Sequence, residues 1–156
     1  QLLRTPTGDH DVDTYVVALG ARGSLGRAYL AGSVYMGENV GNLIEVSLDG
    51  DNDRSDGYAD FNGTDVLDNE ALGFSVVAGF KANDMFAFEA GYGYAEVERM
   101  GGAAEDNEVQ SYYVQSTITL APGVFITPEV GMLDGKEDRS GSFETLYYGA
   151  KWQINF

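Results

Sequence analysis

The sequence predicts an all-β protein, built as an antiparallel transmembrane β-barrel. Three observations predict this fold. Apolar and polar residues alternate with period two in segment after segment, short and long connections between these segments alternate, and acidic residues concentrate in the long connections. A membrane-spanning strand needs only about ten residues of alternating character, so no long apolar run is required.

Seven segments carry the alternation and are expected to be strands. They cover residues 14–22, 27–36, 71–81, 86–94, 111–120, 126–132 and 145–156. In the first segment Tyr15, Val17 and Leu19 are expected to face outward, and the second alternates less cleanly. The last segment is the clearest, because every second residue from Leu146 to Phe156 is apolar and most of the residues between them are polar.

The connections support a barrel whose two ends differ. Those at residues 23–26, 82–84 and 121–123 are short, whereas those at 37–70, 98–109 and 134–141 are long. Within the long connections, residues 49–70, 98–108 and 134–138 hold 15 of the 25 acidic residues. Transmembrane barrels have tight turns on one side of the membrane and long loops on the other.

Composition excludes several classes of protein. A length of 156 residues fits one domain, and a formal charge of -16 argues against binding to nucleic acid. The absence of Cys excludes disulfides and a thiol nucleophile. A hydrolytic site would have to use the single histidine, His10, which precedes the first strand beside Asp9 and Asp11 with no Ser at a pairing distance in sequence, so we expect no enzyme.

A soluble acidic β-sandwich is an alternative, because its strands also alternate apolar and polar residues. Three features argue against it: the polar faces carry Gly, Ser, Thr and Gln, the tyrosines gather near strand ends, and the chain stops on an aromatic strand residue.

The last eight residues, Gly149-Ala150-Lys151-Trp152-Gln153-Ile154-Asn155-Phe156, resemble the terminal strand of Gram-negative outer-membrane β-barrel proteins. The resemblance implies that Trp152, Ile154 and Phe156 form the signal read by the barrel-assembly machinery. Segments 89–94, 111–115 and 121–131 are similar to the C-terminal half of general diffusion porins, most of all to porins of sulfate-reducing bacteria. The resemblance covers residues 12–156.

This resemblance implies that residues 1–156 are a single β-barrel domain or the C-terminal part of one. Seven strands are an odd number, and bacterial barrels of this kind have an even number, so we expect the C-terminal strands of a roughly 16-stranded porin. In the alternative, residues 43–48 supply an eighth strand, and a closed eight-stranded barrel has a structural or adhesive role.

A porin implies a water-filled channel in the bacterial outer membrane for passive diffusion of small hydrophilic solutes and ions. Five charged residues are expected to line the pore: Arg22, Lys81, Glu89, Glu129 and Lys151. The acidic excess favours weak cation preference, and the constriction is expected to lie outside this chain. The implied partners are outer-membrane lipid and lipopolysaccharide, and the implied assembly is a homotrimer.

Residues 49–60 place Asp49, Asp51, Asp53 and Asp60 at the spacing of a calcium-binding loop. Arg54 stands where such a loop needs Gly, and Asp60 replaces the usual bidentate Glu. A solvated acidic loop facing lipopolysaccharide, with or without divalent ions that bridge to lipid phosphates, is the alternative. No other cofactor is expected.

Overall fold

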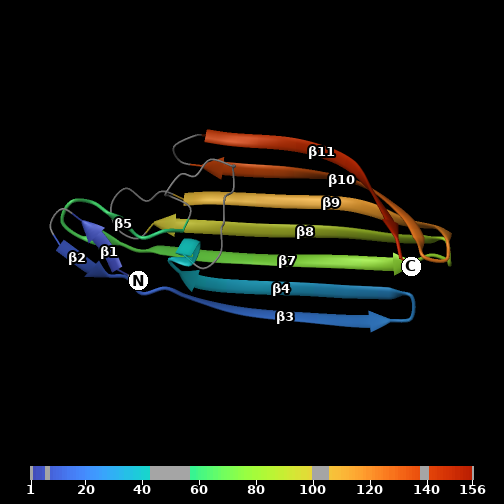
Figure 1. Cartoon of the computed structure of the whole chain (residues 1–156), viewed down its shortest axis with the longest axis horizontal. Helices are drawn as coiled ribbons and strands as arrows, with labels where there is room; N and C mark the ends of the chain where they lie inside the picture. Colours follow the sequence, from blue (N-terminus) through green and yellow to red (C-terminus); the bar gives the residue numbers. More distant parts are fainter. Residues whose placement is uncertain (1, 6–7, 43–56, 100–105, 138–140, 156) are drawn as a thin grey trace.

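Seven long strands form one antiparallel sheet in the computed structural model, which describes residues 2–5, 8–42, 57–99, 106–137 and 141–155 (Figure 1). The strands are β3 (Tyr15–Leu25), β4 (Ala28–Glu38), β7 (Asn69–Lys81), β8 (Phe86–Arg99), β9 (Asp106–Ala121), β10 (Val124–Glu137) and β11 (Gly141–Ile154). The remaining elements are two small hairpins, β1 (Leu2–Thr5) with β2 (Gly8–Asp11) and β5 (Asp60–Phe61) with β6 (Val66–Leu67), and the 3-10 turn η1 (Val40–Asn42). No helix in the described part of the chain is long and apolar enough to cross a membrane.

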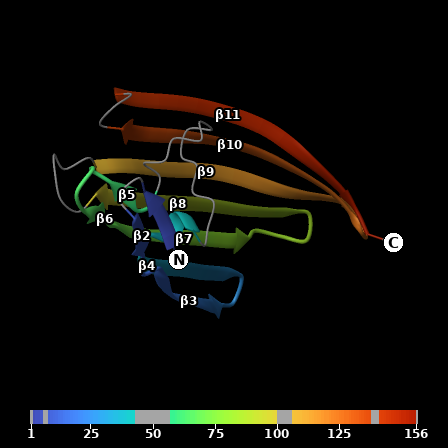
Figure 2. The same cartoon turned by 60° about the vertical axis from the view of Figure 1, so that its left-hand side comes forward.

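The strand order is β11-β10-β9-β8-β7-β4-β3, so each long strand pairs with the next long strand in the sequence. Figures 1 and 2 show a single curved layer in which β10 and β11 bend across the neighbouring strands at one end. The short turns lie at this end, which we call the short-turn end, and the long connections lie at the opposite, long-connection end (Figure 1).

The seven predicted strands are confirmed, and most extend further toward the long-connection end than expected. β8 continues to Arg99 and β9 begins at Asp106, although the alternation is reversed there, with Ala95 and Val97 on the face that carries Glu89 earlier in β8. Pairing of β8 with β9 continues to the row that joins Glu98 and Asp106, because the ladder satisfies backbone groups whatever the side chains are.

The closed eight-stranded alternative is wrong in its placement of an eighth strand. β4 pairs directly with β7 from Ala28 opposite Phe80 to Glu38 opposite Glu70, so no strand lies between them. Residues 43–48, which were expected to supply that strand, lie outside the described residues.

The short turns use residues that tolerate tight backbone geometry. Gly26 between β3 and β4 has a φ of 59° and Gly123 between β9 and β10 has a φ of 80°, conformations that Gly adopts readily. In the turn from β7 to β8, the Asn83 Oδ1 accepts hydrogen bonds from the backbone N–H groups of Met85 and Phe86 at 2.9 and 2.8 Å.

The sheet has one apolar face, and this outer face is exposed. Large apolar side chains on it include Leu19 (73% exposed), Trp152 (65%) and Tyr148 (84%). Nothing in the described residues covers this face as the second sheet of a soluble sandwich would. Lipid is the surrounding in which such a face is stable, because it avoids the cost of exposing apolar surface to water.

Candidate functional site: the polar inner face

Arg22, Lys81, Glu89, Glu129 and Lys151 all lie on the opposite, inner face of the sheet. Cross-strand partners share a face, and one continuous row runs through Gly79, Glu89, Gln115, Glu129 and Gly149 on β7 to β11. The neighbouring rows contain Arg22 opposite Ala31, Lys81 opposite Ala87, and Lys151 opposite Thr127. The predicted residues are therefore brought to one surface, although they come from five strands.

Three neighbouring side chains hold the Glu89 carboxylate in place. Its Oε1 accepts hydrogen bonds from the Tyr113 hydroxyl at 2.7 Å and from the Gln115 Nε2 at 2.5 Å. Its Oε2 accepts a hydrogen bond from the Tyr29 hydroxyl. Hydrogen bonds to an ionised acceptor are the strong kind, so Glu89 is a fixed negative charge on this face.

Arg22 is attached to the same group of residues. Its guanidinium lies 4.0 Å from the centre of the Tyr29 ring, within range of a cation–π interaction. Tyr29 thus contacts Arg22 with its ring and Glu89 with its hydroxyl. A positive and a negative charge are held at fixed positions on the inner face, separated by one aromatic ring.

The large aromatic side chains of the inner face lie flat against it. The Tyr29 ring covers Gly79, the Tyr113 ring covers Gly91, and a Cβ added at either glycine would meet the ring. The same arrangement recurs where Tyr35 covers Gly73, Tyr147 covers Gly131, and Phe143 covers Gly135. Because each glycine leaves room for a ring, the aromatic side chains lie along the surface of the sheet instead of projecting from it.

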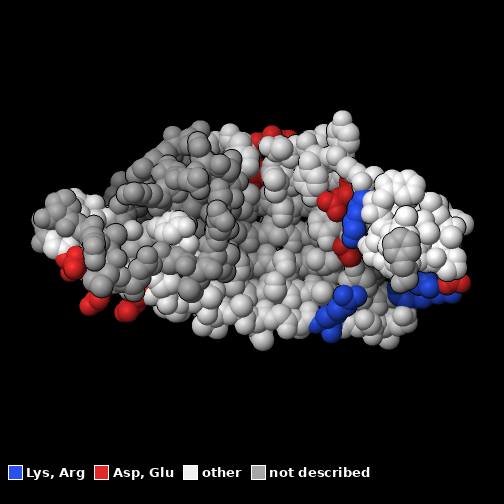
Figure 3. All heavy atoms as spheres, in the orientation of Figure 1, with Lys and Arg blue, Asp and Glu red and all other residues white. Residues whose placement is uncertain are grey.

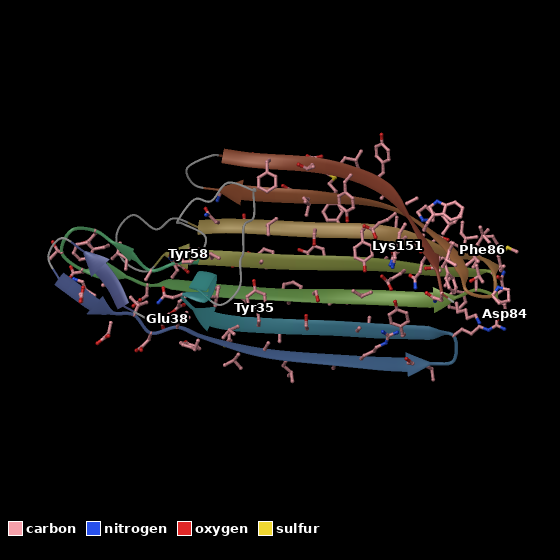
Figure 4. All side chains as sticks on the ribbon, in the orientation of Figure 1. Tyr35, Glu38, Tyr58, Asp84, Phe86 and Lys151 are labelled. Carbon is pink, nitrogen blue, oxygen red and sulfur yellow. The ribbon has the colours of Figure 1, made fainter. Side chains whose placement is uncertain are left out.

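Lys81 differs from the other four charged residues. Its Nζ lies 2.8 Å from Asp84 Oδ1 in the turn that follows β7, and this is the one ion pair found within the described ranges. The hydrogen bond and charge of Lys81 hold the pKa of Asp84 below its usual range. Figure 4 shows Asp84 at the short-turn end of the sheet and Lys151 over its middle strands.

Charges of both signs gather on this face. Figure 3 shows acidic and basic side chains next to one another in the right half of the view, toward the short-turn end. At the long-connection end, on the left, the charged side chains that are visible are acidic.

Two groups of predicted residues are described only in part. Asp49, Asp51 and Asp53 of the predicted calcium loop lie outside the described residues, and Asp60 lies in β5 with its backbone opposite Leu67. No cluster of metal-ligating side chains occurs among the residues that the structure describes. Of the predicted assembly signal, Trp152 and Ile154 lie on the exposed outer face and Phe156 lies outside the described residues.

The sequence did not reveal the residues that position the charges. Tyr29, Tyr113 and Gln115 come from β4 and β9, and they reach Glu89 only after those strands are placed on either side of β7 and β8. The usable signal was the set of glycines on the same face, since a cross-strand glycine makes room for an aromatic ring.

No family model matches the chain, and no curated protein matches it. Among solved structures it is similar to outer-membrane β-barrel proteins, so the chain has an all-β, antiparallel outer-membrane barrel fold. One is described as outer-membrane expressed OmpT of Vibrio cholerae, with a TM-score of 0.54, 18% identity, and coverage of 98% of this chain and 46% of that chain. Two others are in-vitro folded OmpT of Vibrio cholerae. The first has a TM-score of 0.56 at 18% identity and covers 98% of this chain and 45% of that chain. The second, in a trimer form, has the same TM-score and identity and covers 97% and 45%.

The chain spans less than half the length of these structures. All three are outer-membrane proteins, so they support the predicted outer-membrane barrel. All three come from Vibrio cholerae, so they do not support the expected likeness to porins of sulfate-reducing bacteria.

Proposed function

We propose that this chain forms part of the wall of a water-filled outer-membrane channel, through which small hydrophilic solutes and ions diffuse passively. The observation that supports this proposal most is the contrast between the two faces of the sheet. The outer face is apolar and exposed, whereas the inner face carries fixed charges, hydroxyls and flattened aromatic rings. A wall of this kind borders lipid on one side and water on the other.

In this channel the inner charges bias which ions pass. Arg22, Glu89, Glu129 and Lys151 act on ions that move along the wall, and a field between opposite charges orients polar solutes. No bond is made or broken in this function. His10, the residue that a hydrolytic site would need, instead has its ring centre 5.1 Å from that of Phe61, in the region of the small hairpins.

The proposed setting is the bacterial outer membrane, with lipopolysaccharide around the long-connection end and a homotrimer as the assembled form. Trp152 and Ile154, together with Phe156, are proposed as the residues that the barrel-assembly machinery recognises. A similar solved protein has a trimer form, which supports the proposed assembly. A closed barrel with a structural or adhesive role is less well supported, because the rings on the inner face lie along the wall and do not fill the space beside it.

Cysteine accessibility tests the proposed two-sided wall. This chain has no Cys, so each single substitution introduces one thiol into it. Ser75 lies on the inner face of β7 opposite Ser33, and Val76 lies next to it on the outer face. In the whole protein extracted from outer membranes and inserted into a planar bilayer, a charged, water-soluble methanethiosulfonate reagent is expected to lower the conductance of Ser75→Cys. Val76→Cys, the matched control, is expected to keep its conductance.

An equal change of conductance in Ser75→Cys and Val76→Cys after addition of the reagent would contradict the proposed wall. A wild-type protein that inserts into the bilayer and passes no current would contradict the channel function itself.

Replacing Glu89 by Gln is expected to reduce cation preference. A unit charge about 8 Å from an ion in water contributes about 0.5 kcal/mol, which corresponds to an approximately twofold change in an equilibrium constant. The reversal potential across a salt gradient is therefore expected to report an approximately twofold lower cation-to-anion permeability ratio for Glu89→Gln. Glu70→Gln, whose position is on the outer face at the long-connection end, is the control and is expected to leave the ratio near wild type. A ratio that is equal in Glu89→Gln and wild type would show that Glu89 does not face the ion path.

A further inference from the structure

One segment leaves the sheet and packs on its inner face at the long-connection end. Val40, in the turn that follows β4, has 0% of its surface exposed and contacts Ala71 and Val97, with Val16 and Tyr35 beside them. Val16, Gly37, Ala71 and Val97 are successive cross-strand partners on β3, β4, β7 and β8, in one row of the inner face. Val40 therefore lies on the same face as Glu89, nearer the long-connection end.

Gly37 makes room for Val40. A Cβ at Gly37 would lie 2.3 Å from the Tyr15 carbonyl oxygen on β3 and 2.6 Å from the Val40 Cγ1, and both distances are closer than such atoms approach. The inner-face position that any other residue would fill is thus occupied by a side chain from the turn.

Asn39 fixes the direction of this turn. It is fully buried and has a φ of 52°, which reverses the chain at the end of β4. Its backbone N–H donates to the Asn69 carbonyl at 2.8 Å, and the Asn69 N–H donates to the Asn39 Oδ1 at 3.0 Å. The Asn39 Nδ2 donates to the Asp13 carbonyl at 2.8 Å and to the Asp68 Oδ1 at 2.9 Å. The buried polar atoms of Asn39 are thus satisfied by residues next to β3 and β7.

A second part of the chain is attached at the same place. The Gly41 N–H donates to the Gly57 carbonyl at 2.9 Å, and the Asn69 Nδ2 donates to the Tyr58 carbonyl. Gly57 is buried and has a φ of 79°. Residues 39–41 and 57–58 therefore form one hydrogen-bonded unit on the inner side, near the labelled Tyr35 and Tyr58 in Figure 4.

We propose that this unit, made of Asn39, Val40, Gly41, Gly57 and Tyr58, is a further constriction, besides the one expected outside this chain, and that it sets the solute size limit at the long-connection end of the channel. The proposal rests on the proposed channel function. The aromatic rings elsewhere on the inner face lie against the wall, whereas this unit adds a second layer of backbone and side chain over it. The base of this unit is held firmly against the sheet, because Asn39, Val40 and Asn69 are fully buried there.

The test measures single-channel conductance and polyethylene glycol exclusion for the whole protein in planar bilayers. Asn39→Gly keeps a residue that tolerates positive φ and removes the side-chain hydrogen bonds that hold the turn. Val40→Asp places a charge in the apolar contact. Both variants are expected to conduct more than wild type and to admit larger polyethylene glycols.

Asn62→Gly is the matched control. The Asn62 Oδ1 accepts hydrogen bonds from Thr64 N–H and Asp65 N–H in the β5–β6 hairpin, so this substitution also removes side-chain hydrogen bonds from a turn at a different site. Its conductance and size limit are expected to equal those of wild type.

The outcomes separate the two proposals. A wild type that conducts, with the same conductance and size limit in Asn39→Gly, overturns the constriction and leaves the channel function in place. A wild type that inserts without conducting overturns both. Val40→Asp also buries a charge and can therefore prevent insertion. In that case Asn39→Gly decides the test, because an unchanged size limit in Asn39→Gly would by itself overturn the constriction.

Discussion

Val76→Arg in β7 is expected to prevent stable insertion, whereas Val77→Arg, at the next residue of the same strand, is expected to be tolerated. Val76 lies on the outer face with 44% of its surface exposed, opposite Gly32 on β4 and Tyr92 on β8. An Arg that faces lipid near the middle of the bilayer costs about 2–4 kcal/mol. Val77 lies on the inner face opposite Ala31 and Gly91, where an Arg side chain reaches water in the proposed channel.

The measurement is folding of the whole protein into lipid vesicles, with urea titration for the free energy of unfolding. The two variants carry the same change of residue at adjacent positions, so they have the same strand propensity and net charge. Equal loss of stability in both would show that the two faces of β7 meet similar surroundings. A smaller loss in Val76→Arg than in Val77→Arg would reverse the assignment of the lipid-facing side.

Gly91→Val is expected to destabilise the wall and to reduce conductance. A Cβ at Gly91 would lie 2.7 Å from the Tyr113 Cζ, so the ring must leave its place along the wall. The Tyr113 hydroxyl then loses its hydrogen bond to Glu89, which is 2.7 Å long in the wild-type structure, and the ring turns into the space beside the wall. Overpacking of this kind costs about 1–3 kcal/mol.

Gly149→Val supplies the control. Gly149 is also on the inner face, opposite Glu129, and a Cβ there would meet no atom within 4 Å. Since Val favours strands more than Gly does, Gly149→Val is expected to keep or slightly raise the free energy of unfolding. Equal unfolding curves for Gly91→Val and Gly149→Val, with equal conductances, would show that the ring at Tyr113 does not need the space over Gly91.

The strands and their faces could be predicted from sequence because the signal is local. Period-two alternation in a segment such as 145–154 depends only on which residues face lipid and which face the other side. Strand ends were harder to predict. Near the long-connection end of β8 and β9, Glu96 lies opposite Glu108 on the outer face and Ala95 lies opposite Val109 on the inner face. The alternation is therefore reversed there, although the backbone ladder continues.

The candidate site was predicted in its charges but not in its partners. Arg22, Glu89, Glu129 and Lys151 share the inner face because each follows the alternation of its own strand. Tyr29 reaches Glu89 across β7, so this contact requires both the β4–β7 and the β7–β8 registers. A one-residue change in either register would place the tyrosine and the glutamate on opposite faces.

The sequence by itself determined the all-β class, the seven long strands and the separation of an apolar from a polar face, because each depends on neighbours along one strand. Only the tertiary structure decided which residues meet across strands: the rings over the inner glycines, the three donors around Glu89, and Val40 over Gly37. Those contacts join residues from different strands, and their geometry is set by hydrogen-bonded register and by the space that a missing side chain leaves.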